Sequence, residues 1–314
     1  MPAQLVILCG PTATGKTRLG VALAKALDGE VVSADSMQVY RHMAIGTARP
    51  TEEEMDGVPH HMLAVADPDE NYSVARYVAQ AVPIVDDILA RGKVPLIVGG
   101  TGLYIDALRK GQTFSPFSPR SGLREQLQAR ARAGELPQLY EELRAADPEA
   151  AARLHPNDEK RILRALEVWL ETGETITEHD RRTRAVPPRY TAAVLALTYR
   201  DRAALYRRID RRVDEMMARG LADEVRALLA MGVPPEATAM QAIGYKELVP
   251  ALRTGGDLAA AAAEIKLRSR QYAKRQLTWF RRDGSAHWLI LDDPPDFSSL
   301  LQDSTAFLRA QGVR

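Results

Sequence analysis

The sequence of 314 residues contains a single cysteine, Cys9. One thiol cannot form an internal disulfide or a cysteine-based zinc site. Cys9 also lies within the apolar run 4–9, which favours a packing role over a nucleophilic one. Long apolar runs are missing as well, since no stretch approaches the roughly 20 residues that a membrane span requires. The run at 4–9 leaves no room for a signal peptide before it, and we therefore expect a cytoplasmic protein.

The sequence also has almost equal numbers of basic and acidic residues. The formal net charge is +1, which on its own argues against a nucleic-acid partner. The charges are unevenly distributed, however, because residues 200–282 hold 17 Lys and Arg against 10 Asp and Glu. A local basic excess of this kind is what a phosphate backbone attracts. Region 200–282 is therefore a candidate for contact with RNA.

Residues 10–17 form the motif around which the chain is organised. They match the phosphate-loop pattern G-x-x-x-x-G-K-[ST] at every fixed position and read Gly10, Pro11, Thr12, Ala13, Thr14, Gly15, Lys16 and Thr17. Such a loop points backbone N–H groups and a helix N-terminus at phosphate oxygens. Lys16 adds a full positive charge, and Thr17 offers a hydroxyl to Mg²⁺. The motif predicts a diphosphate or nucleotide site with Mg²⁺ as its cofactor.

Strand and helix patterns alternate over the first hundred residues. Strands are predicted at 4–9, 30–34 and 94–98, and helices at 18–27 and 74–91. This alternation is typical of a parallel α/β core.

The composition changes at residue 113. The segment TFSPFSP (113–119) breaks regular structure, and short helical patterns without a strand continue to about residue 183. Beyond Pro187-Pro188, strands are predicted at 192–199 and 287–291 and helices at 202–219, 222–231 and 257–281. The sequence thus predicts a P-loop NTPase-like parallel sheet flanked by helices, with an inserted all-helical subdomain. We assign 1–112 to the first part of the core, 113–189 to the insert, and 190–314 to the return of the core with basic C-terminal helices.

Asp35 follows the second predicted strand and begins the segment DSMQ. In an open parallel sheet, residues beyond the carboxyl ends of the strands face the ligand crevice. Asp35 should therefore lie near the bound phosphates, where it is a candidate general base for an attacking nucleophile. An aspartate that only caps its own loop is the alternative.

The segment GGTG (99–102) follows the strand at 94–98. A P-loop hydrolase is expected to have a Mg²⁺-binding acid at such a strand end, and none is present here. Thr101 offers a hydroxyl that could hold a bridging or leaving-group oxygen, and the glycines let a substrate approach the backbone. A plain tight turn explains this short motif equally well.

Arg208 and Arg212 are four residues apart and so share one face of a predicted helix, from which either could reach a diphosphate. Solvated surface arginines are the alternative. Further basic residues cluster at 160–164. The pair His60-His61 has no further His, Cys or acid at ligand spacing, which favours a structural pair over a metal site.

A basic stretch at 268–282 includes Arg275 and has aromatic residues interleaved with its charges. This pattern suits an RNA backbone with unstacked bases. The aromatic residues are Tyr272, Trp279 and Phe280. A buried core role for part of this aromatic set is the alternative.

Nine segments together resemble the bacterial type of tRNA dimethylallyltransferase, also called isopentenyl-tRNA transferase. In chain order they are GPTATGKT, ADSMQVYR, IGTARP, VPHHM, YSV, VGGTGLY, LHPNDEKRILRALE, AIGYKE and RQYAKRQLTWFRR. They extend over nearly the whole chain, and Glu159-Lys160 departs from the residues usual in the family.

The resemblance implies transfer of a dimethylallyl group from dimethylallyl diphosphate to the N6 amine of the adenosine 3′ to the anticodon. It makes Asp35 the acceptor of the amine proton, with Thr101 and Lys16 as further catalytic residues and Arg212 beside the diphosphate. The expected partners are the tRNA anticodon stem-loop and dimethylallyl diphosphate, and the protein is expected to be a monomer. The residues implied in tRNA binding are Asp35, Ser36, Met37, Gln38, Thr101, Arg124, Glu159, Lys160, Arg161, Ile162, Leu163 and Arg275.

Two other functions remain open from the residues alone. In a P-loop small-molecule kinase, Asp35 would activate a hydroxyl and the helical insert would be a lid. In a non-catalytic RNA-binding NTPase, the loop would serve as a switch. The absence of an acid after the strand at 94–98 and the basic, aromatic stretch 268–282 argue against the kinase.

Overall fold

The structure is a computed structural model that describes residues 4–112 and 122–313. The chain divides into two compact units, one of Met1–Gly111 with Arg189–Arg314 and the other of Gln112–Pro188. Each unit has a hydrophobic core of its own. The predicted break at 113–119 lies outside the described residues.

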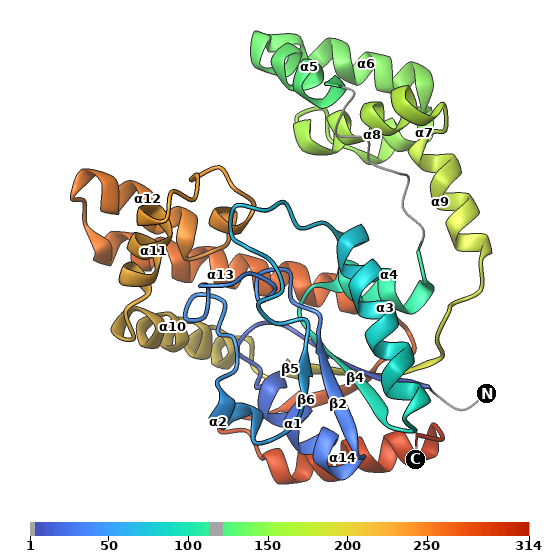
Figure 1. Cartoon of the computed structure of the whole chain (residues 1–314), viewed down its shortest axis with the longest axis vertical. Helices are drawn as coiled ribbons and strands as arrows, with labels where there is room; N and C mark the ends of the chain where they lie inside the picture. The colour runs from blue at the N-terminus through green and yellow to red at the C-terminus, as the bar shows by residue number, and fades with distance from the viewer. Residues whose placement is uncertain (1–3, 113–121, 314) are drawn as a thin grey trace. The chain divides into compact units, whose positions relative to one another are not determined.

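The first unit is built on one six-stranded sheet (Figure 1). All neighbouring strands run parallel, in the order β3-β2-β4-β1-β5-β6. The strands are β1 (Leu5–Cys9), β2 (Gly29–Ser33), β3 (His60–His61), β4 (Val94–Gly99), β5 (Ala192–Tyr199) and β6 (His287–Leu291). All five residues of β1 are buried, which explains its uninterrupted apolar sequence.

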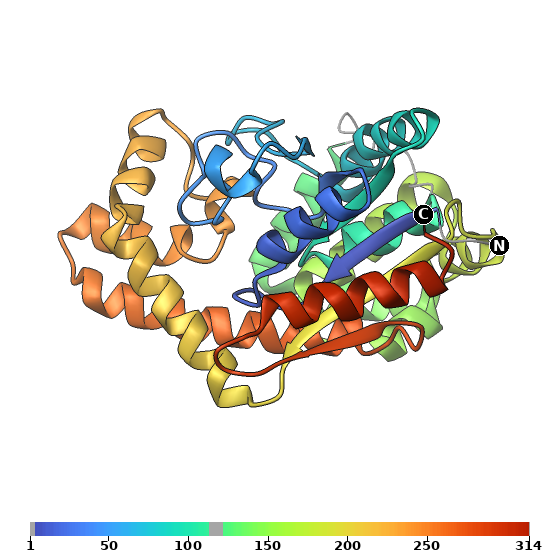
Figure 2. The ribbon, with the colours of Figure 1, turned by 90° about the horizontal axis from the view of Figure 1, so that it is seen from below.

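The first unit also contains helices, some of which pack directly on this sheet. They are α1 (Lys16–Ala26), α2 (Glu52–Met55), α3 (Val74–Ala90), α4 (Gly102–Lys110), α10 (Arg202–Ala218), α11 (Leu221–Ala230), α12 (Tyr245–Thr254), α13 (Leu258–Phe280) and α14 (Phe297–Ala310), with a 3₁₀ turn at Ala239–Gln241. Helices α1 and α14 pack side by side (Figure 2), and α13 packs on α10 and α12. The predicted P-loop NTPase-like parallel sheet with flanking helices is confirmed.

Four helices of the first unit, α2, α4, α12 and α14, and one strand are not predicted by the sequence patterns. Helix α4 begins inside the GGTG segment and α12 contains Pro250, both of which weaken a helical pattern. Strand β3 has only two residues, too few for any periodicity. The sequence patterns also do not predict α14.

The second unit is all-helical in its described part. It contains α5 (Leu123–Arg130), a π-helical segment (Ala131–Glu135), α6 (Leu136–Ala146), α7 (Pro148–Arg153), α8 (Glu159–Thr172) and α9 (Ile176–Ala185). Its core includes Leu127, Leu139, Leu143, Ile162 and Leu166. The buried Asp147 carboxylate caps α7 and accepts hydrogen bonds from the backbone and hydroxyl of Thr177 at 3.0 and 2.7 Å. This bond fixes α9 to the α6–α7 junction.

Membrane crossing is not indicated by any described helix, since none is both long and apolar enough to span a bilayer.

Candidate active site

The phosphate loop 10–17 connects β1 to α1 at the carboxyl end of the sheet. Gly10 and Gly15 have φ of 145° and 79°, a region that favours glycine. A Cβ at Gly10 would lie 2.7 Å from the Leu197 carbonyl oxygen, and one at Gly15 would lie 2.4 Å from the Phe297 ring. Both glycines of the motif are therefore required by the fold.

Lys16 and Arg212 supply positive charge to this loop. The Lys16 ammonium donates to the Pro11 carbonyl at 2.8 Å. Burial, and next the charge of Arg212, lowers the pKa of Lys16 to about 8, while Asp35 acts in the opposite direction. Burial also lowers the pKa of Arg212, again against the charge of Asp35. These mutual effects place both cations near the Asp35 carboxylate.

Of the two arginines predicted on one helix face, Arg212 is the better candidate for contacting a diphosphate. Within the described chain its Nε is buried without a hydrogen-bond partner, and such a donor is costly unless a ligand satisfies it. Arg208 instead lies over the Tyr199 ring and 4.0 Å from Asp293. Arg212 therefore has a donor available for an anion beside Lys16.

Asp35 begins a tight turn after β2. Its Oδ1 accepts hydrogen bonds from the backbone N–H groups of Met37 and Gln38 at 2.9 and 3.4 Å. The Gln38 amide accepts from the Ser33 hydroxyl at 3.0 Å and donates to the Thr47 carbonyl at 3.3 Å. The carboxylate thus has one oxygen held by the backbone, as in the loop-capping alternative, and among the described residues no hydrogen bond to its second oxygen is found.

Thr101 lies directly beside this turn because β2 and β4 are neighbours in the sheet. The backbone N–H of Ser36 donates to Thr101 Oγ1 at 3.0 Å. The backbone N–H of Thr101 donates to the Ala34 carbonyl at 3.1 Å. A Cβ at Gly99 would lie 2.2 Å from that same carbonyl oxygen, so the close approach requires glycine. The structure brings the two predicted segments together.

Helix α13 contributes side chains that sequence reasoning missed as site residues. Gln276 bonds to the phosphate loop at Thr12 and to the segment 99–102 at Gly100. The Tyr272 phenol lies near Thr101. Trp279 lies against Gly102. Two of the aromatic residues predicted to stack on RNA bases therefore lie at the segment 99–102. The third, Phe280, is a buried core residue.

Glu224 is a further residue that the sequence did not single out. Its carboxylate accepts the backbone N–H groups of Ala44, Ile45 and Gly46 at 2.8, 2.8 and 3.1 Å. The hydroxyl of the fully buried Tyr245 donates to it at 2.5 Å. These bonds anchor the loop that follows the Asp35 turn, and they connect the IGTARP and AIGYKE segments.

The residues predicted to contact tRNA are distributed over both units. Ser36, Met37 and Gln38 are half-buried around the Asp35 turn, and Arg275 is exposed on α13. In the second unit Arg124, Glu159, Lys160 and Arg161 are exposed, and a shallow depression of about 470 Å³ runs along His155–Lys160. Ile162 and Leu163, in contrast, are 0% and 7% exposed core residues, so their side chains are not available to a surface ligand.

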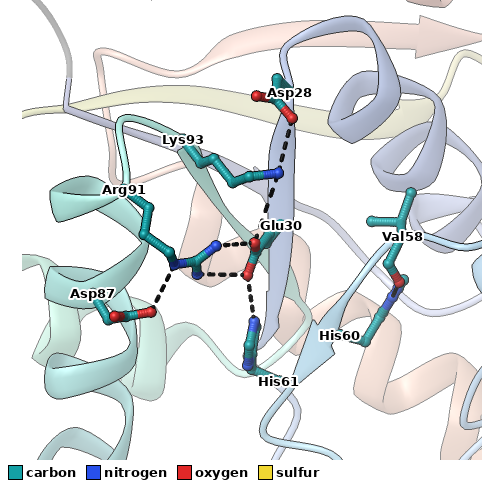
Figure 3. Close-up of polar contacts among 8 residues, drawn as sticks. All are labelled: Asp28, Glu30, Val58, His60, His61, Asp87, Arg91 and Lys93. Atoms are coloured by element: carbon teal, nitrogen blue, oxygen red, sulfur yellow. Dashed lines mark hydrogen bonds and ion pairs between the residues drawn. The ribbon is translucent and has the colours of Figure 1, made fainter.

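The His60-His61 pair forms the edge strand β3, and both side chains bond to neighbouring groups (Figure 3). His61 Nε2 bonds to Glu30 Oε2 at 2.8 Å, while His60 Nδ1 bonds to the Val58 carbonyl at 2.8 Å. Glu30 is 4% exposed and also bonds to Arg91, whose guanidinium lowers the pKa of Glu30 to about 2. His61 is thus part of a polar cluster around the buried Glu30, and His60 is bonded to the backbone.

Binding of a metal ion at the phosphate loop would require oxygens from the substrate. Across residues 4–112 and 122–313, no group of three or more His, Cys, Asp or Glu could hold one. Thr17, in the first turn of α1, offers one hydroxyl. Mg²⁺ keeps several waters and commonly binds through one or two protein oxygens plus substrate phosphates. The residues present therefore fit an ion that binds together with a diphosphate.

Comparison with models of protein families shows to which family the chain belongs. The family model described as IPP transferase matches residues 38–283, and one described as isopentenyl transferase matches residues 3–66. The chain belongs to the IPP transferase family. This membership confirms the resemblance deduced from the motifs and disfavours the kinase alternative.

Several named members of this family match the chain over most of its length. The tRNA dimethylallyltransferase of Caldanaerobacter subterraneus subsp. tengcongensis is 45% identical, with 98% of each chain covered. That of Symbiobacterium thermophilum is 49% identical, with 94% of this chain and 91% of the relative covered.

Two solved structures are also similar. The tRNA isopentenylpyrophosphate transferase from Bacillus halodurans matches with a TM-score of 0.72 and 40% identity, covering 99% of this chain and 98% of its own. A eukaryotic dimethylallyltransferase acting on tRNA matches with a TM-score of 0.74 and 30% identity, covering 91% and 73%.

Proposed function

We propose that the protein transfers the dimethylallyl group of dimethylallyl diphosphate to the N6 amine of the adenosine 3′ to the anticodon in tRNA, releasing diphosphate. Family membership and the names of relatives at 45% and 49% identity support this reaction. The observation that carries the proposal is the joining of the phosphate loop to the Asp35 turn and Thr101, with glycines instead of an acid after β4.

The proposed step is a displacement at C1 of the dimethylallyl group. The C1–O bond breaks and its electron pair leaves with the diphosphate, while the N6 lone pair forms the new C1–N6 bond. The N6 proton passes to Asp35 as general base. Lys16 and Arg212 stabilise the charge that develops on the leaving diphosphate, and Thr101 holds the reacting groups. Mg²⁺ bound through Thr17 and the diphosphate would add positive charge at the same oxygens.

The loop residues Gly10–Thr17 bind the diphosphate through backbone N–H groups, which explains a phosphate loop in an enzyme that needs no positioned water. The acceptor adenosine must leave the anticodon-loop stack, at a cost of a few kcal/mol that contacts to the flipped base offset. Asp35–Gln38, Thr101 and Arg275 in the first unit would contact this tRNA. Arg124 and the exposed residues Glu159–Arg161 would do so in the second unit, which we propose clasps the anticodon stem-loop. We further propose a monomeric, cytoplasmic enzyme.

Labelled substrates test the reaction directly. Purified protein, Mg²⁺ and an unmodified tRNA transcript are incubated with dimethylallyl diphosphate labelled in its hydrocarbon, and label is expected in the RNA. A transcript with guanosine at the acceptor position is the control and should remain unlabelled. Transfer of label from γ-labelled ATP to a metabolite or to RNA would instead establish the kinase alternative.

Asp35→Asn tests the general base. The asparagine Oδ1 can still accept the Met37 and Gln38 N–H groups, so the turn is expected to keep its shape. Loss of the base should lower kcat about 10²-fold or more. A variant with wild-type kcat would remove Asp35 from the chemistry.

A further inference from the structure

Helix α13 places three side chains, one helical turn apart, against the two loops of the proposed active site. Tyr272, Gln276 and Trp279 are spaced four and three residues apart and so share one face of the helix. The two loops are the phosphate loop 10–17 and the acceptor loop, which we define as residues 99–102. Gln276 is the member of this face that contacts both.

The Gln276 side chain forms a bridge between the two loops. Its Oε1 accepts the backbone N–H of Thr12 at 3.0 Å, and its Nε2 donates to the Gly100 carbonyl at 2.9 Å. The residue is 6% exposed, so water does not substitute readily for either bond. A side-chain amide is planar and carries a donor and an acceptor at a fixed separation. Gln276 therefore fixes the distance between Thr12 and Gly100.

The glycines of the acceptor loop are explained by the same helix face. A Cβ at Gly100 would lie 2.2 Å from Gln276 Nε2. A Cβ at Gly102 would lie 2.2 Å from Trp279 Cδ1. Because a larger residue at either position would displace Gln276 or Trp279, the two glycines leave room for this face of α13.

Tyr272 connects the bridge to the reacting groups. Its phenol lies near both Thr101 and Gln276, and each of these side chains lowers the pKa of the phenol against the larger effect of burial. Burial, and next the charge of Asp35, raises the pKa of Tyr272 to about 12, so the phenol stays protonated at neutral pH. The Thr101 hydroxyl is held on its other side by the Ser36 N–H. Tyr272 and Gln276 thus act on the orientation of Thr101 from the helix side.

We propose that Gln276, assisted by Tyr272, is the positioning residue that sets the separation between the diphosphate-binding loop and the acceptor loop. This inference rests on the proposed function and deepens it, because the two loops would hold the two substrates whose reacting atoms must meet. Displacement of reacting groups by about 1 Å can cost on the order of 10²-fold in rate. Loss of the bridge should therefore lower kcat more than it weakens the binding of either substrate.

The variant Gln276→Glu tests the bridge, because protonation of the glutamate at low pH should restore both hydrogen bonds. A protonated glutamic acid has one O–H donor and one carbonyl acceptor, so it can replace the amide in both bonds. The ionised carboxylate only accepts, loses the bond to Gly100 and adds negative charge beside the phosphate loop. We expect kcat of Gln276→Glu at neutral pH to be about 10- to 10²-fold below wild type. The ratio of variant to wild-type kcat should rise as pH is lowered, and taking the ratio cancels pH effects that are common to both proteins.

Two further variants complete the experiment. Gln276→Leu cannot form either bond and should show low kcat at every pH, with KM for dimethylallyl diphosphate changed less than kcat. Gln271→Glu makes the same chemical change on the exposed face of α13 and should keep wild-type kcat throughout. Circular dichroism reports the folded fraction of each variant.

The outcomes separate the inference from the function on which it rests. Wild-type protein that transfers no label to tRNA would overturn the proposed function itself. Active wild type with an unchanged kcat in Gln276→Leu, or a pH-independent ratio in Gln276→Glu, would overturn the positioning role alone.

Discussion

The pKa of Lys16 makes the affinity of the phosphate loop for diphosphate dependent on pH. Burial and the neighbouring Arg212 lower this pKa to about 8 in the ligand-free protein. Only the protonated ammonium attracts phosphate oxygens, so affinity should be constant below that pKa and fall above it. One pH unit above the pKa, about a tenth of the lysine is protonated, and binding should weaken roughly tenfold, or about 1.4 kcal/mol.

Calorimetry with a non-transferable thio analogue of dimethylallyl diphosphate measures this effect. The terminal phosphate titrates near about pH 6, so above about pH 7 the ligand charge is constant. Lys16→Met should bind weakly with no pH dependence. Arg212→Gln removes the second cause of the shift and should move the midpoint to higher pH. A wild-type affinity that stays constant through pH 9, or an unmoved midpoint in Arg212→Gln, would refute this account of the site.

Three further predictions concern other parts of the chain. Arg275→Gln should weaken tRNA binding and lower the slope of log K against log salt by about 1; Arg309→Gln on α14 is the control, and an equal slope in both variants would exclude Arg275 from the RNA surface. Glu30→Gln removes the partner of Arg91 and His61 and should lower the free energy of unfolding by about 1–3 kcal/mol. Because the folded pKa of Glu30 is depressed to about 2 from 4.5, the wild-type advantage in urea titrations should be full above the unfolded value and disappear as pH falls toward about 2; an advantage independent of pH would contradict this. Glu224→Gln leaves fewer acceptors for the three N–H groups of 44–46, so hydrogen exchange there should accelerate, and unchanged protection would show that the carboxylate is not the anchor.

The phosphate loop and its neighbours were predictable because their signals are local. The pattern at 10–17 specifies residue types, and the apolar runs around it specify strands of a parallel sheet. Parallel strands end at one edge, which is why Asp35 and Thr101 could be expected near the loop. The bond between Ser36 and Thr101 agrees with that expectation. The chemical roles of these residues stay predictions.

Gln276 and Glu224 were not predictable for a physical reason. Their partners are backbone groups: the Thr12 N–H, the Gly100 carbonyl and the N–H groups of 44–46. Every residue except proline carries the same backbone groups, so the partner sequence contains no sign of the contact. The basic, aromatic pattern of α13 was similarly ambiguous, since Tyr272 and Trp279 lie against the acceptor loop while Arg275 faces outward. Only the folded chain separates the two faces of that helix.

The central claim is the transfer of a dimethylallyl group to one tRNA adenosine. The most direct measurement is mass spectrometry of nucleosides and oligonucleotides from unmodified tRNA incubated with the protein, Mg²⁺ and dimethylallyl diphosphate. We predict one dimethylallyl group in place of one N6 hydrogen on the adenosine 3′ to the anticodon, with one diphosphate released per modified base. An unmodified adenosine, or a group added at another base, in the presence of folded protein would contradict the account.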